Sequence, residues 1–296
     1  MRTDGPLVIA LDGSPHSAQT LAWGLAEATV RRTDVLLTRV YEEPHSVAQW
    51  GRYPMVAADL GWDVEAKQYL ADQLERESAR HPALDLDTAL LHGPAVPVLQ
   101  ELSTDAQLLV VGASGHAGGM GIGSVSDQLA ARARCPVVVV RNHETTDRGA
   151  PVVVGVDGSP SSLDAARVAG LEAVLRGVPL HVVHARPAVT ALYGLGLPVA
   201  AFGPGVIVED PEPDRATVER AVAELRAAHP GLDVRLTIVV QDPAHAIVLA
   251  ARAAQLVVVG SRGLGTLAGL LLGAVSRAVV RTAPVSVLVL HDGAGS

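Results

Sequence analysis

Short runs of aliphatic residues alternate along the chain with longer stretches in which apolar residues recur at helical spacing. Near-continuous runs of Val and Leu are typical of strands that are covered on both faces of a sheet. An alternation of strand and helix predicts parallel sheets with helices on both sides. The expected strands are about Leu7–Leu11, Val35–Val40, Leu84–Leu91, Leu108–Val111 and Val137–Val140, then Val152–Val156, Leu180–His184, Leu232–Val240, Leu256–Val259 and Ser286–Leu290.

Two of the helical stretches follow the first strand of each half. We expect their apolar positions to share one helical face. These positions are Ala18, Leu21, Ala22, Leu25 and Ala28 in the first stretch, and Leu163, Ala166, Gly170, Ala173 and Val174 in the second. The segments Tyr41–Asp63 and Ala185–Pro213, which contain Gly and Pro, are expected to be longer connections after the second strand of each half.

The second half of the chain repeats the first. LVIALDGSPHSA at Leu7 returns as VVVGVDGSPSSL at Val152, and QLLVVGASG returns as QLVVVGSRG. CPVVVVR at Cys135 returns as APVSVLVL at Ala283, so three markers keep their order and nearly their spacing. This pattern indicates a domain duplication. We predict an α/β protein of two tandem, doubly wound parallel-sheet domains, residues 1–142 and 150–296.

Composition narrows the classes of function. The 296 residues suit two domains, and 49% hydrophobic against 18% charged residues argue against disorder. A net charge of −8 and only 3% aromatic residues argue against a nucleic-acid partner. The single cysteine excludes an internal disulfide framework. We find no signal peptide and no apolar run of about 18 residues, so we expect a cytoplasmic protein with no membrane association.

The turn after the first strand is the first candidate for chemistry. It reads Asp12-Gly13-Ser14-Pro15 in one half and Asp157-Gly158-Ser159-Pro160 in the other. Ligands of open α/β sheets bind beyond the carboxyl ends of the strands, where an Asp can accept hydrogen bonds from a base or a ribose. Helix capping is the alternative, since Ser and Pro are favoured at a helix start. Capping leaves the preceding Asp and Gly unexplained.

The second candidate is a glycine-rich loop after the fourth strand of each half. It runs from Gly112 through Gly115 to Gly123-Ser124, and from Gly260 through Gly263 to Gly273-Ala274. Such a loop exposes backbone N–H groups and leads into a helix N-terminus, which together can hold phosphate oxygens. Glycine permits the close approach that a Cβ would block. The alternative is an ordinary surface loop.

These motifs together resemble the universal stress protein family in its tandem form, over almost the whole chain. The resemblance rests on the strand followed by Asp-Gly-Ser, the G-x2-G-x9-G-[ST] loop and the closing C/A-P-V-x-V strand. It implies five-stranded parallel sheets in the order 3-2-1-4-5 and ATP held between strands one and four. We also expect a homodimer of tandem chains. Mg²⁺ is expected with the triphosphate, held mainly by its oxygens.

The resemblance also assigns residues to the ATP site. Asp12 and Asp157, each followed by its glycine (Gly13, Gly158), are expected at the adenosine end, and the backbones of Val40 and Ala185 at adenine. The ribose and phosphates are expected at Gly112, Gly115, Gly123 and Ser124, and at Gly260, Gly263 and Gly273. Both copies depart from the pattern. Seven residues, not nine, separate Gly115 from Gly123, and Ala274 replaces the usual Ser or Thr.

The expected function is therefore ATP binding in a stress-response or regulatory role, with little or no catalytic turnover. The sequence shows no evident base, arginine finger or metal cage of the kind that phosphoryl transfer requires. None of the 11 histidines belongs to a recognisable set of metal ligands. Two alternatives stay open. One is a slow ATPase or adenylyl-transfer enzyme on the same scaffold, and the other is an assembly protein that binds no nucleotide.

Overall fold

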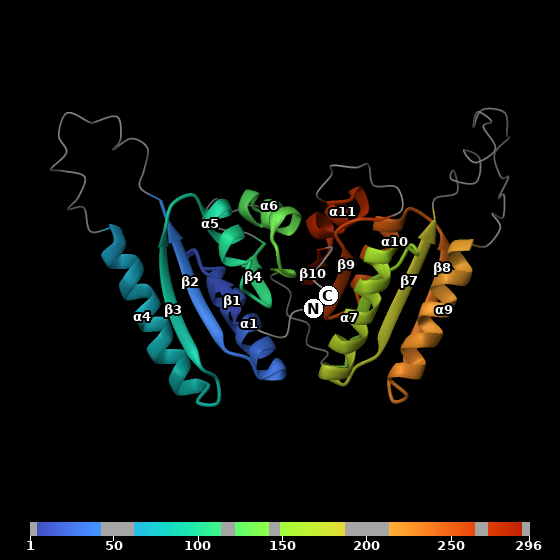
Figure 1. Cartoon of the computed structure of the whole chain (residues 1–296), viewed down its shortest axis with the longest axis horizontal. Coiled ribbons are helices and arrows are strands. Elements are labelled where there is room, and N and C mark those ends of the chain that lie inside the picture. Colours follow the sequence, from blue (N-terminus) through green and yellow to red (C-terminus); the bar gives the residue numbers. More distant parts are fainter. Residues whose placement is uncertain are drawn as a thin grey trace, which may run out of the picture. The chain divides into compact units, whose positions relative to one another are not determined.

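The first half of the chain forms a parallel sheet in the computed structural model of the protein (Figure 1). Its strands are ordered β3-β2-β1-β4-β5. Their bounds are β1 Leu7–Ala10, β2 Val35–Tyr41, β3 Leu86–His92, β4 Leu108–Gly112 and β5 Val137–Val140. The predicted parallel pairing and the order 3-2-1-4-5 are both confirmed here.

The second half forms an equivalent sheet, ordered β8-β7-β6-β9-β10. Its strands are β6 Val152–Gly155, β7 Leu180–Arg186, β8 Val234–Val240, β9 Leu256–Gly260 and β10 Val287–Leu290. The predicted strand ends agree to within two residues. β3 and β8 begin two residues later than expected because Leu84 and Leu232 each donate to a turn carbonyl instead, at His81 and His229.

The structure describes residues 5–42, 62–113, 122–141, 149–186, 213–263 and 272–291. The chain divides into two compact units, Met1–Asn142 and His143–Gly295. Most of each long connection predicted after the second strand lies outside the described residues. Within the described ranges, no helix is both long and apolar enough to cross a membrane.

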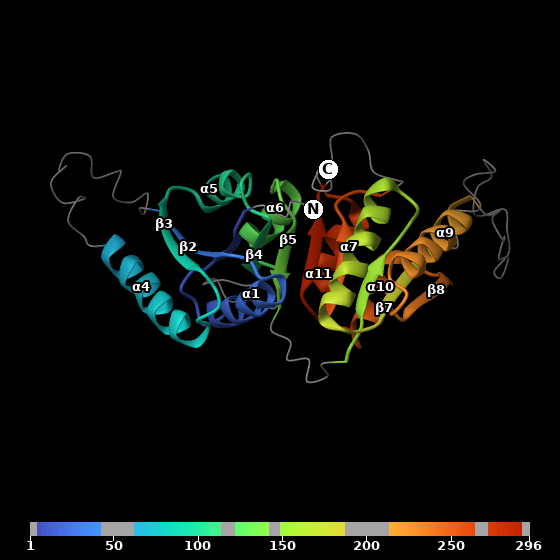
Figure 2. The same cartoon turned by 60° about the horizontal axis from the view of Figure 1, so that its bottom comes forward.

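Each sheet is covered by helices on both faces (Figures 1 and 2). In the first unit, α1 (Ser17–Arg31) and α4 (Trp62–Arg80) pack on one face, with α5 (Ala95–Leu102) and α6 (Ser124–Arg132) on the other. In the second unit, α7 (Pro160–Arg176) and α9 (Pro213–Ala228) oppose α10 (Pro243–Ala251) and α11 (Ala274–Thr282). This double cover explains why Leu108–Val111 in β4 and all residues of β9, which are central strands, are buried.

The predicted apolar helix faces are partly wrong. In α1, Leu21, Leu25 and Ala28 are buried, but Ala18 and Ala22 are exposed. In α7, Val174 is 47% exposed and Leu163 is half-buried. The sheet-facing side of α7 carries small residues, Ser162, Ala165 and Ala169, which allow the helix to lie close to the strands. The helix is therefore rotated away from its larger apolar side chains.

The two units also start their first helices differently. Helix α7 begins as the Ser-Pro pattern predicts, with Pro160 at its first turn and the Ser159 hydroxyl accepting the Ser162 N–H at 3.3 Å. Helix α1 begins only at Ser17, and the side chain of its N-cap residue, His16, makes no capping hydrogen bond to the helix. The expectation of a Ser14 cap is wrong for the first unit. There the Ser17 N–H, the counterpart of the Ser162 N–H, donates to the Ser14 backbone carbonyl at 3.0 Å and not to the Ser14 hydroxyl.

Candidate functional site

A cavity opens beyond the carboxyl ends of the strands in each unit. Each has a volume of about 310 Å³ and lies where the first and fourth strands of its sheet end. The first is lined by the predicted residues Asp12, Val40, Gly112, Gly123 and Ser124, and the second by Asp157, Ala185, Gly260, Gly263, Gly273 and Ala274. The structure thus brings these candidates together, unit by unit. Gly115 lies outside the described residues.

Gly13 and Gly158 lie in the turns beneath the cavities and are not among the lining residues. Their φ angles are +77° and +89°, in the left-handed region that L side chains rarely adopt. The glycine after each Asp is therefore required by the backbone of the turn. This explains the glycine that capping left unexplained, without assigning it to a ligand.

The Asp12 carboxylate organises the first turn. Its Oδ1 accepts the Ser14 N–H at 2.9 Å and the Ser17 hydroxyl at 2.7 Å. The Ser17 Oγ in turn accepts the N–H groups of Asp12 and Gly13, at 3.2 and 3.1 Å. Asp12 nevertheless remains exposed at the cavity. The carboxylate is thereby held in a defined orientation at the end of β1.

The Asp157 carboxylate makes a different set of contacts. Its Oδ1 accepts the Ser159 N–H at 3.0 Å, whereas Ser162, the counterpart of Ser17, donates to the Ser159 carbonyl at 2.9 Å. The other oxygen lies against Gly263, so close that a Cβ at this position would overlap it. Asp157 therefore connects the turn after β6 to the start of the glycine-rich loop.

The side chains beneath the two turns also differ between the units. In the first unit the Arg39 guanidinium lies against Gly13 and over the Tyr69 ring, 5.3 Å from its centroid. Burial raises the pKa of the Tyr69 hydroxyl. The register of β7 places His184 at the equivalent position, where its Nδ1 lies 2.8 Å from the Val156 carbonyl oxygen. The first site is thus supported by a cation and the second by a buried imidazole.

The end of each glycine-rich loop is pinned by two repeated hydrogen bonds. The amides of Gly123 and Gly273 donate to the carbonyls of Ala113 and Ser261, at 2.6 and 2.7 Å. These glycine amides are therefore engaged within the protein. The next three N–H groups belong to the first turns of α6 and α11, where helix geometry supplies no acceptor. They line the cavities, at Ser124–Ser126 and Ala274–Ser276. The dipoles of both helices favour an anion there.

Position 260 must be a glycine for a reason that the sequence did not reveal. A Cβ at this position would stand 2.5 Å from the Ser161 Oγ and 2.8 Å from the Ser161 carbonyl oxygen. Ser161 belongs to the first turn of α7. The expectation that this glycine serves close approach of a ligand is therefore incomplete, because the approaching group is a helix of the same unit.

Sequence reasoning missed several residues that line the cavities. Ala95 and Leu99 on α5, and Pro243 and Ile247 on α10, form an apolar wall in each unit. The repeat could have revealed them. Pro243 lies 148 positions after Ala95, and Ile247 lies 148 positions after Leu99, which is the same offset as between Gly112 and Gly260. An apolar wall opposite an Asp suits a ligand with one flat apolar part and one polar edge.

Ser126 and Ser276 were also missed as structural members of the site. Their hydroxyls donate to the carbonyls of Gly112 and Gly260, at 2.5 and 2.6 Å, and so tie each helix start to the end of the fourth strand. We expect Ser276→Ala to lower the free energy of unfolding by about 1–2 kcal/mol, because a buried acceptor loses its donor. Chemical denaturation of the full chain measures this loss.

Thr282→Ala is the matched control for Ser276→Ala on the same helix. The Thr282 hydroxyl also donates to a backbone carbonyl, that of Ala278 at 2.7 Å, but it is exposed to water. We expect its removal to change the stability by less than about 0.5 kcal/mol. Equal losses from the two variants would contradict a specific role for Ser276.

Comparison with known proteins shows similarity along nearly the whole chain. A profile of the Universal stress protein family matches residues 5–141 and 150–291. Two universal stress proteins of Mycobacterium tuberculosis are similar, one 36% identical over 296 residues and one 32% identical over 299 residues. The alignments cover 97% of this chain and 97% and 96% of those proteins. A crystal structure of a universal stress protein from Archaeoglobus fulgidus has the same fold, with a TM-score of 0.67 at 19% identity, over 98% of this chain and 97% of that one.

Proposed function

Because this chain belongs to the universal stress protein family, we propose that it is a regulatory protein that binds ATP at two sites, one in each unit. One observation carries the proposal. Each unit places an Asp, the end of its second strand and a helix N-terminus around a cavity of about 310 Å³. A volume of this order accommodates a ligand of nucleotide size.

The chemistry of each lining fits the parts of ATP. The apolar wall of Leu99 or Ile247 would contact adenine, with the backbone of Val40 or Ala185 at its edge. Asp12 or Asp157 would accept a hydrogen bond from a ribose hydroxyl. The N–H groups that open α6 and α11 would hold phosphate oxygens. Mg²⁺ would neutralise phosphate charge, bound mainly by the phosphate oxygens themselves.

We expect slow ATP hydrolysis because the two cavities have few ionisable side chains. Among the described lining residues, the ionisable side chains are Asp12 in the first cavity and Asp157 and Arg262 in the second. No lysine or histidine is among those described lining residues. General-base catalysis and charge stabilisation in phosphoryl transfer require more than this. We therefore propose that the protein acts by binding ATP and not by turning it over. We also propose that it is cytoplasmic and forms a homodimer of tandem chains.

Two measurements test the proposal. Purified full-length protein is titrated with ATP and Mg²⁺ by calorimetry, and saturable binding with two sites per chain is expected. Absence of heat at millimolar ATP would refute it. Turnover should stay well below the roughly 10 s⁻¹ typical of enzymes. A rate near that value, lost on Asp157→Ala, would instead support the enzymatic alternative. Light scattering that gives the mass of a single chain would contradict the dimer.

Ala274→Ser tests the phosphate end of the second site. It restores the hydroxyl that the first site has at Ser124, at the start of the helix after the loop. A donor to a charged acceptor contributes about 1.5–3 kcal/mol before water competition is considered. We expect ATP binding at this site to tighten roughly three- to tenfold. Calorimetry on a chain whose first site is blocked measures the change, and an unchanged affinity would count against a phosphate at α11.

A further inference from the structure

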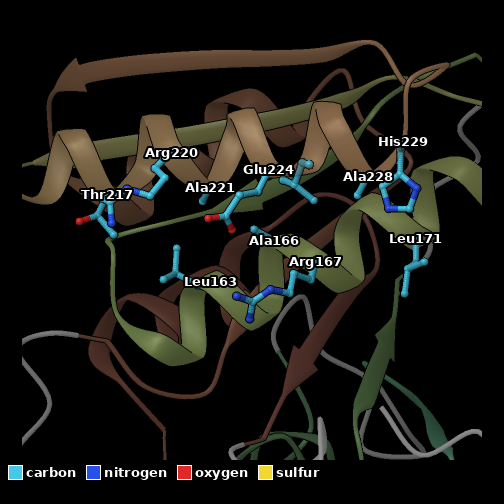
Figure 3. A pocket seen from close by; sticks show the side chains of 11 residues that line it. Leu163, Ala166, Arg167, Leu171, Thr217, Arg220, Ala221, Glu224, Ala228 and His229 are labelled. Carbon is cyan, nitrogen blue, oxygen red and sulfur yellow. The ribbon is translucent and has the colours of Figure 1, made fainter.

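A cavity of a different kind lies on the opposite face of the second sheet, between α7 and α9. Its volume is about 370 Å³, and it is separate from the nucleotide cavity, which is on the α10 and α11 side. Figure 3 shows α9 above and α7 below, with side chains of both helices turned toward the space between them. The apolar part of the lining consists of Leu163, Ala166, Leu171, Ala221, Leu225 and Ala228.

The first unit shows what normally fills this position. Repeated hydrogen bonds align the helices of the two units. Thr33 N–H to the Ala28 carbonyl matches Val178 to Ala173, and His81 to Glu77 matches His229 to Leu225. In this alignment four large residues of the first unit are replaced by small ones. The pairs are Leu21 and Ala166, Leu25 and Gly170, Tyr69 and Thr217, and Gln73 and Ala221.

Other replacements make the space more apolar. Leu171 and Leu225 stand where the first unit has Ala26 and Glu77. Leu225 is buried, but Leu171 is 48% exposed beside the opening. The second unit therefore leaves apolar surface in contact with water where the first unit packs its own side chains. Such exposure costs free energy unless another molecule covers it.

The shape of the cavity limits what can enter. The Leu225 Cδ2 lies only 3.0 Å from where a Cβ of Gly170 would stand, so α7 and α9 touch through this glycine. Two helices that touch at this glycine leave no room between them there for a third helix, which with its side chains is about 10–12 Å in diameter. The eight helical steps from Leu163 to Leu171 span about 12 Å. A thin chain of about that length fits better than a partner helix.

Two arginines line the rim, and Arg220 is the one at a defined end of the cavity. Thr217 and Arg220 lie together at the end away from His229 (Figure 3). Arg167 is paired with Asp164 at 2.5 Å, whereas Arg220 has no ion pair within the described residues. Glu224 stands one turn further along α9 and faces the middle of the cavity (Figure 3). An anionic head group is therefore favoured at Arg220 and disfavoured near Glu224.

We propose that this cavity binds a medium-chain aliphatic carboxylate. The chain lies along Ala166, Ala221 and Leu225, and the carboxylate pairs with Arg220. Among the described residues of the first unit, the counterpart of this cavity is filled by the buried side chains of Leu21, Leu25 and Gln73, so we assign the site to the second unit. The proposal does not depend on ATP binding, which we propose for the cavity on the other face of the sheet.

Decanoate is the probe, titrated into full-length protein below its micelle concentration and followed by calorimetry. Each methylene removed should weaken binding about fourfold, so octanoate should bind more than tenfold more weakly than decanoate. Decanol, which lacks the charge, should bind several-fold more weakly than decanoate. Failure of decanoate to saturate the protein at millimolar concentration would overturn the proposal, and so would indifference to chain length.

Variants locate the binding. Ala166→Leu introduces the side chain that the first unit carries at Leu21 and should weaken decanoate at least tenfold. Ala223→Leu, on the exposed side of α9, is the control and should leave it unchanged. Arg220→Gln should weaken decanoate but not decanol, and Glu224→Gln should tighten decanoate. ATP titration and thermal unfolding of each variant confirm an intact fold. Unaltered decanoate affinity in a folded Ala166→Leu protein would place the ligand elsewhere and refute the site.

Discussion

Replacing Gly260 by alanine is expected to lower the stability of the second unit by about 2–3 kcal/mol. The new Cβ would stand 2.5–2.9 Å from three atoms of Ser161, two of which are backbone atoms of α7. A backbone cannot rotate away as a side chain can, so β9 or the start of α7 must shift. At roughly 2–4 °C per kcal/mol for a unit of this size, the melting temperature should fall by about 5–10 °C.

Gly231→Ala is the matched control in the same unit. Its backbone has no restrictive φ angle, and nothing lies within 4 Å of a Cβ built there. The first unit already carries Ala83 at the equivalent position. Its effect should be within about 0.5 kcal/mol. If Gly260→Ala proves as mild as this control, the close contact between β9 and α7 does not constrain the residue.

Ala274→Glu should abolish ATP binding at the second site, with a loss of at least about a hundredfold. Ala274 is exposed at the start of α11 and lines the cavity. A carboxylate there would stand where the proposal puts phosphates. Two unit charges 4 Å apart interact by about 4 kcal/mol at an effective dielectric constant of 20, and partial screening still leaves a large repulsion.

The same substitution should not harm the fold. A negative charge in the first turn favours a helix by about 0.3–1 kcal/mol, so thermal stability should stay equal or rise while binding falls. Ala274→Gln, which has nearly the same size without the charge, should change the affinity by less than about threefold. Ser124→Glu should remove the first site alone, and the double variant should bind no ATP. Retention of two sites in Ala274→Glu would refute a phosphate at α11.

The α/β class could be read from the chain because its cause is local. The runs of Val and Leu at β4, β5, β9 and β10 bury both faces of their strands, and few other structures accommodate such runs. The duplication added a second prediction. It predicted which segments are equivalent, and the two sheets indeed repeat the same strand order.

The candidate cavities could be predicted in outline for the same reason. Residues at the carboxyl ends of parallel strands meet at one edge of the sheet. The topology therefore places Asp12, Val40 and Gly112 near one another. Their roles toward a ligand remain predictions. The apolar walls on α5 and α10 were missed because no motif marks them, although their offset in the repeat does.

By itself the sequence determined the repeat, the strands, their parallel arrangement and some of the residues that gather at each cavity. Those features follow from local patterns and the geometry of parallel sheets. Only the tertiary structure decided the late start of α1, the rotation of α7, the contact of Gly260 with Ser161 and the space between α7 and α9. The start of α1 depends on the hydrogen bonds between Asp12 and Ser17. The other three features depend on contacts between segments far apart in the chain, where the size of one side chain sets how closely another element can approach.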